Sequence, residues 1–134
     1  VRGEPMIAPH LKKIRPFLRA GDFAPGSWGN RLVDELGPAD VTVEKIAYSA
    51  FYQTRMEWTL RKLGIEHLLV AGIVTNGGVA TTFRAAHVRE FDAILLEDGC
   101  AAFSQKTHDE AVQALRPVGR VASIAEMTAE IEAL

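Results

Sequence analysis

Cysteine is almost absent from this 134-residue sequence, which contains a single one, Cys100. One cysteine excludes a disulfide within the chain and a metal site built from several thiolates, and it points to a cytoplasmic protein. Basic runs are absent as well, and the formal net charge is −2. Proteins that bind nucleic acid usually carry a basic patch that pairs with phosphates, so the sequence predicts no nucleic-acid partner.

Long hydrophobic runs and metal-ligand patterns are also missing. No apolar run approaches the roughly 20 residues that a membrane-spanning helix needs, so no membrane contact is predicted. The four histidines lack the close spacing of metal ligands, and we predict neither a metal nor another cofactor. The remaining composition, 48% hydrophobic and 24% charged, is typical of a single globular domain covering residues 1–134.

The beginning of the sequence contains no strand-like run. Val1–Ala20 carries prolines, which restrict any helix, and the chain begins with Val rather than Met. We therefore expect the domain to be N-terminally incomplete, with its first strands before Val1. The composition of Gly21–Asn30 is typical of a loop, and that of Arg31–Leu36 of a short helix.

From residue 41 onward, strand-like and helix-like segments alternate. The predicted strands are Val41–Ile46, His67–Val74, Asp92–Glu97 and Val118–Ala122, and the predicted helices are Thr54–Leu63, Gly77–Arg89 and two that begin at the capping boxes of Thr107 and Ser123. The nearly continuous apolar character of His67–Val74 predicts a strand covered on both faces. The alternation indicates the α/β class, a parallel sheet flanked by helices, with sites beyond the carboxyl ends of the strands.

The stretch Gly72–Val79 lies where a predicted strand gives way to a predicted helix. Its three glycines allow the backbone to approach a ligand closely, and the helix N-terminus would direct free N–H groups into the crevice. This arrangement suits an oxyanion or a substrate carboxylate. The spacing is neither the dinucleotide fingerprint nor a P-loop, and a glycine-rich connector that only permits tight packing is an equally good interpretation.

Lys45 lies at the end of the strand-like run Val41–Ile46. A charged side chain is uncommon there unless it reaches the crevice, and Ser49–Tyr52 directly after it would form an ordered loop over the same crevice. The alternative is a lysine that simply emerges at the edge of a strand.

Several stretches together resemble a known family. They are F-A-P-G-S-W-G-N-R-L-V-D-E-L-G-P (Phe23–Pro38), V-E-K-I-A-Y-S-A-F-Y-Q-T (Val43–Thr54), L-R-K-L-G-I-E-H-L-L-V-A-G-I-V-T-N-G-G-V (Leu60–Val79), F-R-A-A (Phe83–Ala86) and E-D-G-C-A-A-F-S-Q-K-T-H-D-E (Glu97–Glu110). In this order they are similar to the isochorismatase-like hydrolases, also called the cysteine hydrolase family. The resemblance implies a Rossmann-like, three-layer α/β/α domain that forms a homo-oligomer, a dimer or a tetramer.

The resemblance also implies site residues. The family's amidase members use an aspartate on the first strand, a lysine, and a cysteine at a helix N-terminus. The lysine corresponds to Lys45, the cysteine of the T-N-x-C-V motif corresponds to Gly78, and the aspartate belongs to a strand that would precede Val1. The family's cis peptide bond corresponds to Ile73–Val74, with the backbone N–H groups of Val74 and Gly78 as an oxyanion hole.

A glycine at the nucleophile position closes the family's covalent route. Gly78 cannot form a thioester, and Cys100, in a loop-like stretch after the next strand, does not replace the missing thiol. Two branches similar to this chain carry glycine here: isochorismatases, which protonate the enol-ether carbon of a vinyl ether, and a T-N-x-G-V branch with no assigned substrate. Ala101–Ser104 followed by His108 is similar to the first branch, whereas Thr75–Asn76 replaces its Ala-His pair and favours the second.

These observations lead to one functional hypothesis with alternatives. We expect a hydrolase that cleaves a small vinyl-ether, amide or ureide substrate with acid/base assistance and without a cysteine nucleophile. The alternatives are a non-catalytic member that binds a ligand or partner, and an amidase whose nucleophilic cysteine was replaced by Gly78. The residues expected to line the substrate are Thr75, Asn76, Tyr52 and Trp28.

Overall fold

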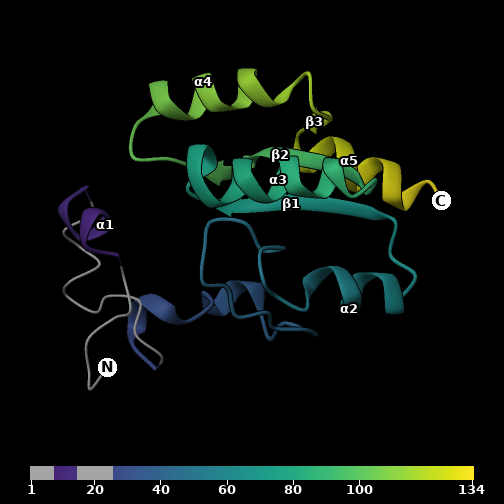
Figure 1. Cartoon of the computed structure of the whole chain (residues 1–134). Helices are drawn as coiled ribbons and strands as arrows, with labels where there is room; N and C mark the ends of the chain where they lie inside the picture. Colours follow the sequence, from purple (N-terminus) through teal and green to yellow (C-terminus); the bar gives the residue numbers. More distant parts are fainter. Residues whose placement is uncertain (1–7, 15–25) are drawn as a thin grey trace. The chain divides into compact units, whose positions relative to one another are not determined.

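The computed structural model describes residues 8–14 and 26–134, and Figure 1 shows the elements along the chain. The chain divides into two compact units, Val1–Thr42 and Val43–Leu134. The expected single domain over residues 1–134 stays a prediction. No helix within the described ranges is both long and apolar enough to cross a membrane.

The described residues of the first unit form short helical segments, namely α1 (Pro9–Ile14) and the 3₁₀ turns η2 (Trp28–Asn30) and η3 (Asp34–Leu36). The helix predicted over Arg31–Leu36 is therefore shorter than expected, and it ends at Gly37, whose φ of 62° favours glycine. Half of the predicted loop Gly21–Asn30 lies outside the described residues, and its last three residues form η2.

The second unit alternates helices and strands. Its elements are α2 (Met56–Lys62), β1 (His67–Ile73), the π-helical turn η4 (Thr75–Val79), α3 (Ala80–Val88), β2 (Asp92–Ala101), α4 (Gln105–Leu115), β3 (Arg120–Ala122) and α5 (Ile124–Glu132). The strands form one parallel sheet in the order β1-β2-β3. A parallel sheet flanked by helices confirms the predicted α/β class, and it brings the carboxyl ends of β1 and β2 to one edge.

The strand predicted over Val41–Ile46 is wrong. Its β-branched residues suit a strand, but a strand also needs a neighbour that completes its hydrogen-bond ladder. The sheet of the described residues consists of β1, β2 and β3, and residues 41–46 belong to none of them.

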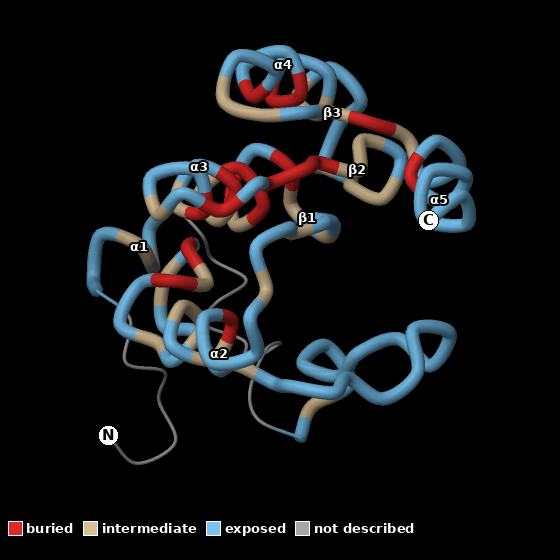
Figure 2. Tube along the Cα trace, turned by 90° about the vertical axis from the view of Figure 1, so that its right-hand side faces the viewer, coloured by how far each residue is buried: buried red, intermediate tan, exposed pale blue. Residues whose placement is uncertain are grey.

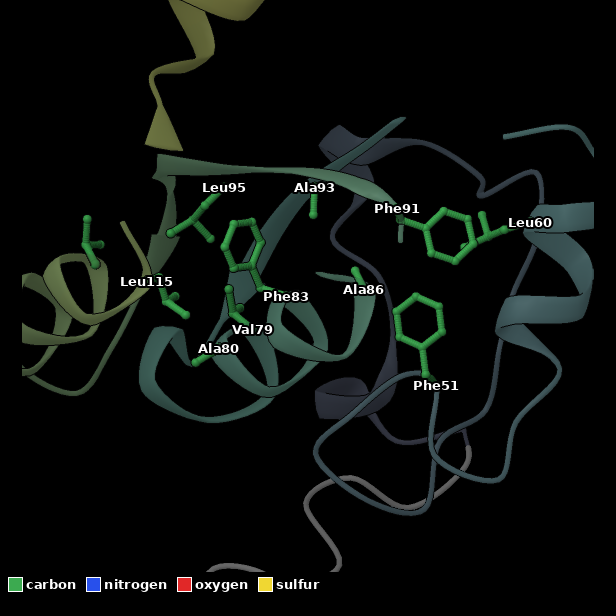
Figure 3. Packing of buried hydrophobic residues seen from close by; sticks show 11 residues of the cluster. Phe51, Leu60, Val79, Ala80, Phe83, Ala86, Phe91, Ala93, Leu95 and Leu115 are labelled. Atoms are coloured by element: carbon green, nitrogen blue, oxygen red, sulfur yellow. The ribbon is translucent and has the colours of Figure 1, made fainter. Parts of the chain in front are cut away.

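The core of this unit lies on both faces of the central strand β2. Ala93 and Leu95 point toward α3 and α4, where they pack with Phe83 and Leu115 in the cluster of Figure 3. The alternate residue Ile94 points to the other face, where it packs with buried residues of β3 and α5, Ala122 and Met127. Because the side chains of a strand alternate between its faces, β2 is covered on both.

The edge strand β1 has a different environment. Burial alternates along it between half-buried and exposed residues, so that Leu68 and Val70 pack on the core whereas Leu69 and Ile73 are exposed. Figure 2 shows this contrast between the two strands. The expectation that His67–Val74 is covered on both faces is therefore wrong for the described residues, because the helix on the second face, α5, packs against β2.

The two predicted capping boxes have opposite outcomes. At α5, the Ser123 hydroxyl accepts from the Glu126 N–H at 3.2 Å and the Glu126 carboxylate accepts from the Ser123 N–H at 2.6 Å, which confirms the box. At α4, the cap is Ser104 rather than Thr107. Its hydroxyl accepts from the Thr107 N–H at 3.2 Å, so the helix begins one turn earlier than predicted.

Candidate functional site

The turn between β1 and α3 is the first part of the candidate site. The Ile73–Val74 peptide bond is cis, as the family resemblance implies, and Gly72 before it has a φ of 127°. The π-helical turn η4 then leads without interruption into α3. The positive end of this combined helix therefore lies at the carboxyl end of β1, where it favours an anion.

Two adjacent glycines in the turn have different surroundings. A methyl group on Gly77 would lie 2.9 Å from Val74 Cγ2, closer than real side chains approach. A methyl group on Gly78 would make ordinary contacts, at 3.5 Å from the Tyr48 carbonyl oxygen and 3.9 Å from the Ile73 carbonyl oxygen. Position 77 therefore favours glycine, whereas position 78 has room for a side chain.

Lys45 forms the opposite side of the site. Its Nζ lies 3.9 Å from the position that a Cβ on Gly78 would occupy, and it donates to the Ala47 carbonyl at 3.0 Å. The structure thus brings together Lys45 and Gly78, as the resemblance implies, although Lys45 stands on a loop and not at a strand end. The alternative interpretation, a lysine that emerges at the edge of a strand, is also wrong, because residues 41–46 form no strand.

Two contacts hold the Lys45 loop, one with α3 and one with Phe91, which follows α3. The Ala50 N–H donates to the Thr82 hydroxyl at 3.0 Å, and Phe51 is buried in the core with its ring centroid 5.8 Å from that of Phe91 (Figure 3). Thr82 lies one helical turn after Gly78, so it faces the same side of the helix. Sequence reasoning missed Thr82, because a threonine on a helix gives no signal of a partner 32 residues away.

The four residues predicted to line the substrate differ in their burial and position. Thr75 is fully buried, and its hydroxyl lies 2.9 Å from His108 Nδ1 on α4, so it supports the turn from inside. Asn76 and Tyr52 are exposed, and Trp28 belongs to the first unit. Contact of any of the four with a substrate stays a prediction. The sequence singles out His108 only through the family resemblance and gives no signal of its hydrogen bond with Thr75.

A cavity lies at the carboxyl end of β2, apart from the turn described above. It is an open cavity of about 380 Å³, and its lining includes Glu97, Asp98, Cys100 and His108. The two carboxylates have structural partners, since Arg116 donates to Glu97 at 3.0 Å and the Ile124 N–H donates to Asp98 at 2.8 Å. The Asp98 carboxylate thus caps the first residue of α5, Ile124.

Cys100 has the wrong chemistry for a substitute nucleophile. Burial raises the pKa of its thiol, a hydrogen bond with the Gly72 backbone lowers that pKa by less, and the nearby Asp98 charge adds a still smaller increase. A thiol with a raised pKa is protonated at neutral pH and attacks slowly. Among residues 8–14 and 26–134, no group of three or more His, Cys, Asp or Glu side chains is placed to hold a metal ion.

The turn, its cis peptide and the lysine beside it agree with a family match. The sequence model of the isochorismatase domain matches residues 5–126 of the chain. The chain therefore belongs to the isochorismatase family, whose hydrolases share this α/β fold.

Individual proteins of known sequence or structure are similar to this chain. Ureidoacrylate amidohydrolase RutB of Variovorax paradoxus is 40% identical over 88 residues, which are 64% of this chain and 35% of the relative. The chain thus spans about a third of the length of that relative. A cysteine hydrolase from Pseudomonas syringae pv. phaseolicola has a TM-score of 0.84 at 26% identity, covering 99% of this chain and 68% of its own. The nicotinamidase PncA from Bacillus subtilis has a TM-score of 0.58 at 29% identity, and the match covers 60% of this chain and 45% of the nicotinamidase.

Proposed function

We propose that this protein is a hydrolase that cleaves a small, anionic amide, ureide or vinyl-ether substrate without forming a covalent intermediate. The observation that carries the proposal is the placement of Lys45 Nζ 3.9 Å from an unfilled side-chain position at Gly78, at the N-terminus of the helix formed by η4 and α3. An ammonium group and a helix N-terminus that face one space favour negative charge there, either in the substrate or in the transition state.

The proposed chemistry differs between the two substrate groups. With an amide or ureide, a water oxygen attacks the carbonyl carbon, and the carbonyl oxygen becomes an oxyanion held by the N–H groups of Val74 and Gly78. The proton that the water loses passes to the nitrogen as the C–N bond breaks. With a vinyl ether, an acid protonates the enol-ether carbon, water adds to the oxocarbenium carbon, and the C–O bond breaks to leave a ketone and an alcohol. In both routes Lys45 stabilises anionic charge.

The relatives favour the amide and ureide group. The relative that shares 40% identity is named for the hydrolysis of ureidoacrylate, and structural neighbours include nicotinamidases. Those names describe the relatives and not this chain, so both substrate groups enter the test. We further propose a cytoplasmic homo-oligomer, a dimer or tetramer, that binds neither nucleic acid nor membranes.

The test measures product release from two panels. Ammonia is assayed with ureidoacrylate, nicotinamide and other small amides, and pyruvate is assayed with isochorismate. We expect turnover in one panel, a loss of at least about tenfold in Lys45→Ala, and no change in Lys62→Ala, an exposed lysine on α2. Turnover should also survive Cys100→Ser, because no cysteine takes part.

Two results would favour the alternatives. No turnover in either panel, together with calorimetric binding of a carboxylate that Lys45→Ala weakens, would show a binding protein. The room beside Gly78 favours a second candidate, an amidase whose cysteine was replaced. In that case Gly78→Cys should create amide hydrolysis that the original chain lacks, whereas Gly78→Ser and Gly78→Ala should not.

A further inference from the structure

One hydrogen bond ties the turn of the candidate site to a helix that is distant in sequence. Thr75 Oγ1 and His108 Nδ1 are 2.9 Å apart and separated by 33 residues. Thr75 has no exposed surface, and it is the first residue of η4, against which α4 packs. A hydrogen bond in such a buried place fixes geometry, since breaking it leaves a polar atom without a partner.

The position of Thr75 within the turn gives this bond its importance. It directly follows Val74 and lies three residues before Gly78, so the two N–H groups proposed to hold an anion flank it. The fully buried Thr75 side chain forms this hydrogen bond with the half-buried His108 ring. A rotation of the Thr75 backbone would redirect both N–H groups.

We propose that His108 is a positioning residue for the anion-binding turn, acting through Thr75 to fix the directions of the Val74 and Gly78 N–H groups. This inference rests on the proposed function, because that function assigns the turn its role. His108 lies on α4, and its side chain also lines the cavity at the end of β2. In the proposed role it acts through Thr75 rather than by contact with reacting atoms.

The chemistry of the pair suggests the variants. Either partner can donate the hydrogen bond. The Thr75 hydroxyl donates to an unprotonated Nδ1, and it accepts from a protonated Nδ1. An asparagine side chain places a polar atom close to the position of Nδ1, whereas phenylalanine keeps the ring shape without a nitrogen. His108→Asn should thus preserve the bond, and His108→Phe should remove it.

A thiol placed in the turn can report on the N–H groups without any substrate. The Gly78→Cys variant puts a sulfur at the helix N-terminus beside Lys45, where correctly directed N–H groups lower a thiol pKa. The rate of iodoacetamide labelling at position 78 is followed against pH by peptide mass, which separates it from labelling of Cys100. In this background we expect His108→Phe to slow labelling at neutral pH by about fivefold to tenfold, the value of one buried hydrogen bond.

The matched variants decide the interpretation. His108→Asn should label within about twofold of the Gly78→Cys parent, as should Gln113→Ala, an exposed change on the same helix. Thr75→Val should slow labelling as much as His108→Phe does, and the two together should slow it no further, because they break the same bond. Thr75→Val also serves if His108→Phe does not fold.

The proposal is overturned if His108→Phe labels as fast as the parent, if His108→Asn is as slow as His108→Phe, or if the Thr75 and His108 effects add. The labelling assay uses no substrate, so its outcome is independent of the product assays. A responsive label with no turnover in any panel would refute the proposed hydrolase and leave the positioning role of His108 standing.

Discussion

The two sides of the candidate site are held in different ways. The turn side, Thr75–Val79, packs against α4, and Thr75, Gly77 and Val79 in it are buried. On the loop side, Lys45 is exposed, and its ammonium group donates to the carbonyl of Ala47, two residues further along the same loop. One side is fixed by packing, and the other depends on where its loop is anchored.

This difference has a physical lesson for the site. A helix N-terminus and backbone N–H groups cannot move without moving the core, so the turn is organised before a ligand arrives. A lysine side chain has many rotamers and a strongly hydrated ammonium, so it adapts to the ligand at an entropic cost. The distance between Lys45 Nζ and Gly78 can therefore change when a ligand binds. The contacts of Ala50 and Phe51 limit this change, because they hold the loop that carries Lys45.

The largest expected effect removes the main anchor of the loop side. Phe51 is 5% exposed and packs on Phe91, so Phe51→Ala should lower the free energy of unfolding by about 3–5 kcal/mol. Urea unfolding followed by circular dichroism measures the loss. The neighbouring Tyr52→Ala is the matched control, since Tyr52 is 54% exposed and should change stability by less than about 1 kcal/mol. Equal losses for the two variants would show that the loop is not anchored through Phe51.

The sequence predicts the turn side much better than the loop side. The strand-to-helix change at Gly72–Val79 depends on local periodicity and glycine content, which the sequence contains directly. The β-branched residues around Lys45 predict a strand, but a strand also depends on a neighbouring strand that the local pattern cannot identify. Family resemblance, and not periodicity, paired Lys45 with Gly78. The long-range bonds of Thr82 and His108 lie between segments whose separation in sequence hides them.

A smaller effect should separate the two glycines of the turn. Gly77→Ala places a methyl group 2.9 Å from Val74 Cγ2, and valine is stiff, so overpacking should cost about 1–3 kcal/mol. Gly78→Ala meets only ordinary contacts within a helical turn, and it should raise stability by about 0.5–1 kcal/mol. The two variants differ by one position and carry the same new atom, so each controls the other. Similar thermal midpoints for both would contradict the difference in room.

A smaller loss should follow removal of the second loop anchor. Thr82→Val keeps the shape of the side chain but takes away the acceptor of the Ala50 N–H, and we expect a loss of about 1 kcal/mol. Thr82→Ser retains the hydroxyl and should keep most of the stability. Amide hydrogen exchange at Ala50 gives the direct measurement, since protection should fall in the valine variant and persist in the serine variant. Unchanged protection in both would mean that another contact holds the loop.

The smallest effect on stability should come from Lys45, the residue with the largest expected effect on ligand binding. Its side chain is exposed, so Lys45→Met should change the free energy of unfolding by less than about 0.5 kcal/mol. The same variant removes the positive charge beside Gly78 and should weaken carboxylate binding by at least about tenfold, measured by calorimetry at low salt. Lys62→Met, an exposed charge on α2, should alter neither quantity. If Lys45→Met instead destabilised the fold as much as Thr82→Val, the lysine would belong to the scaffold, and the division between a fixed turn and an adaptable loop would fail.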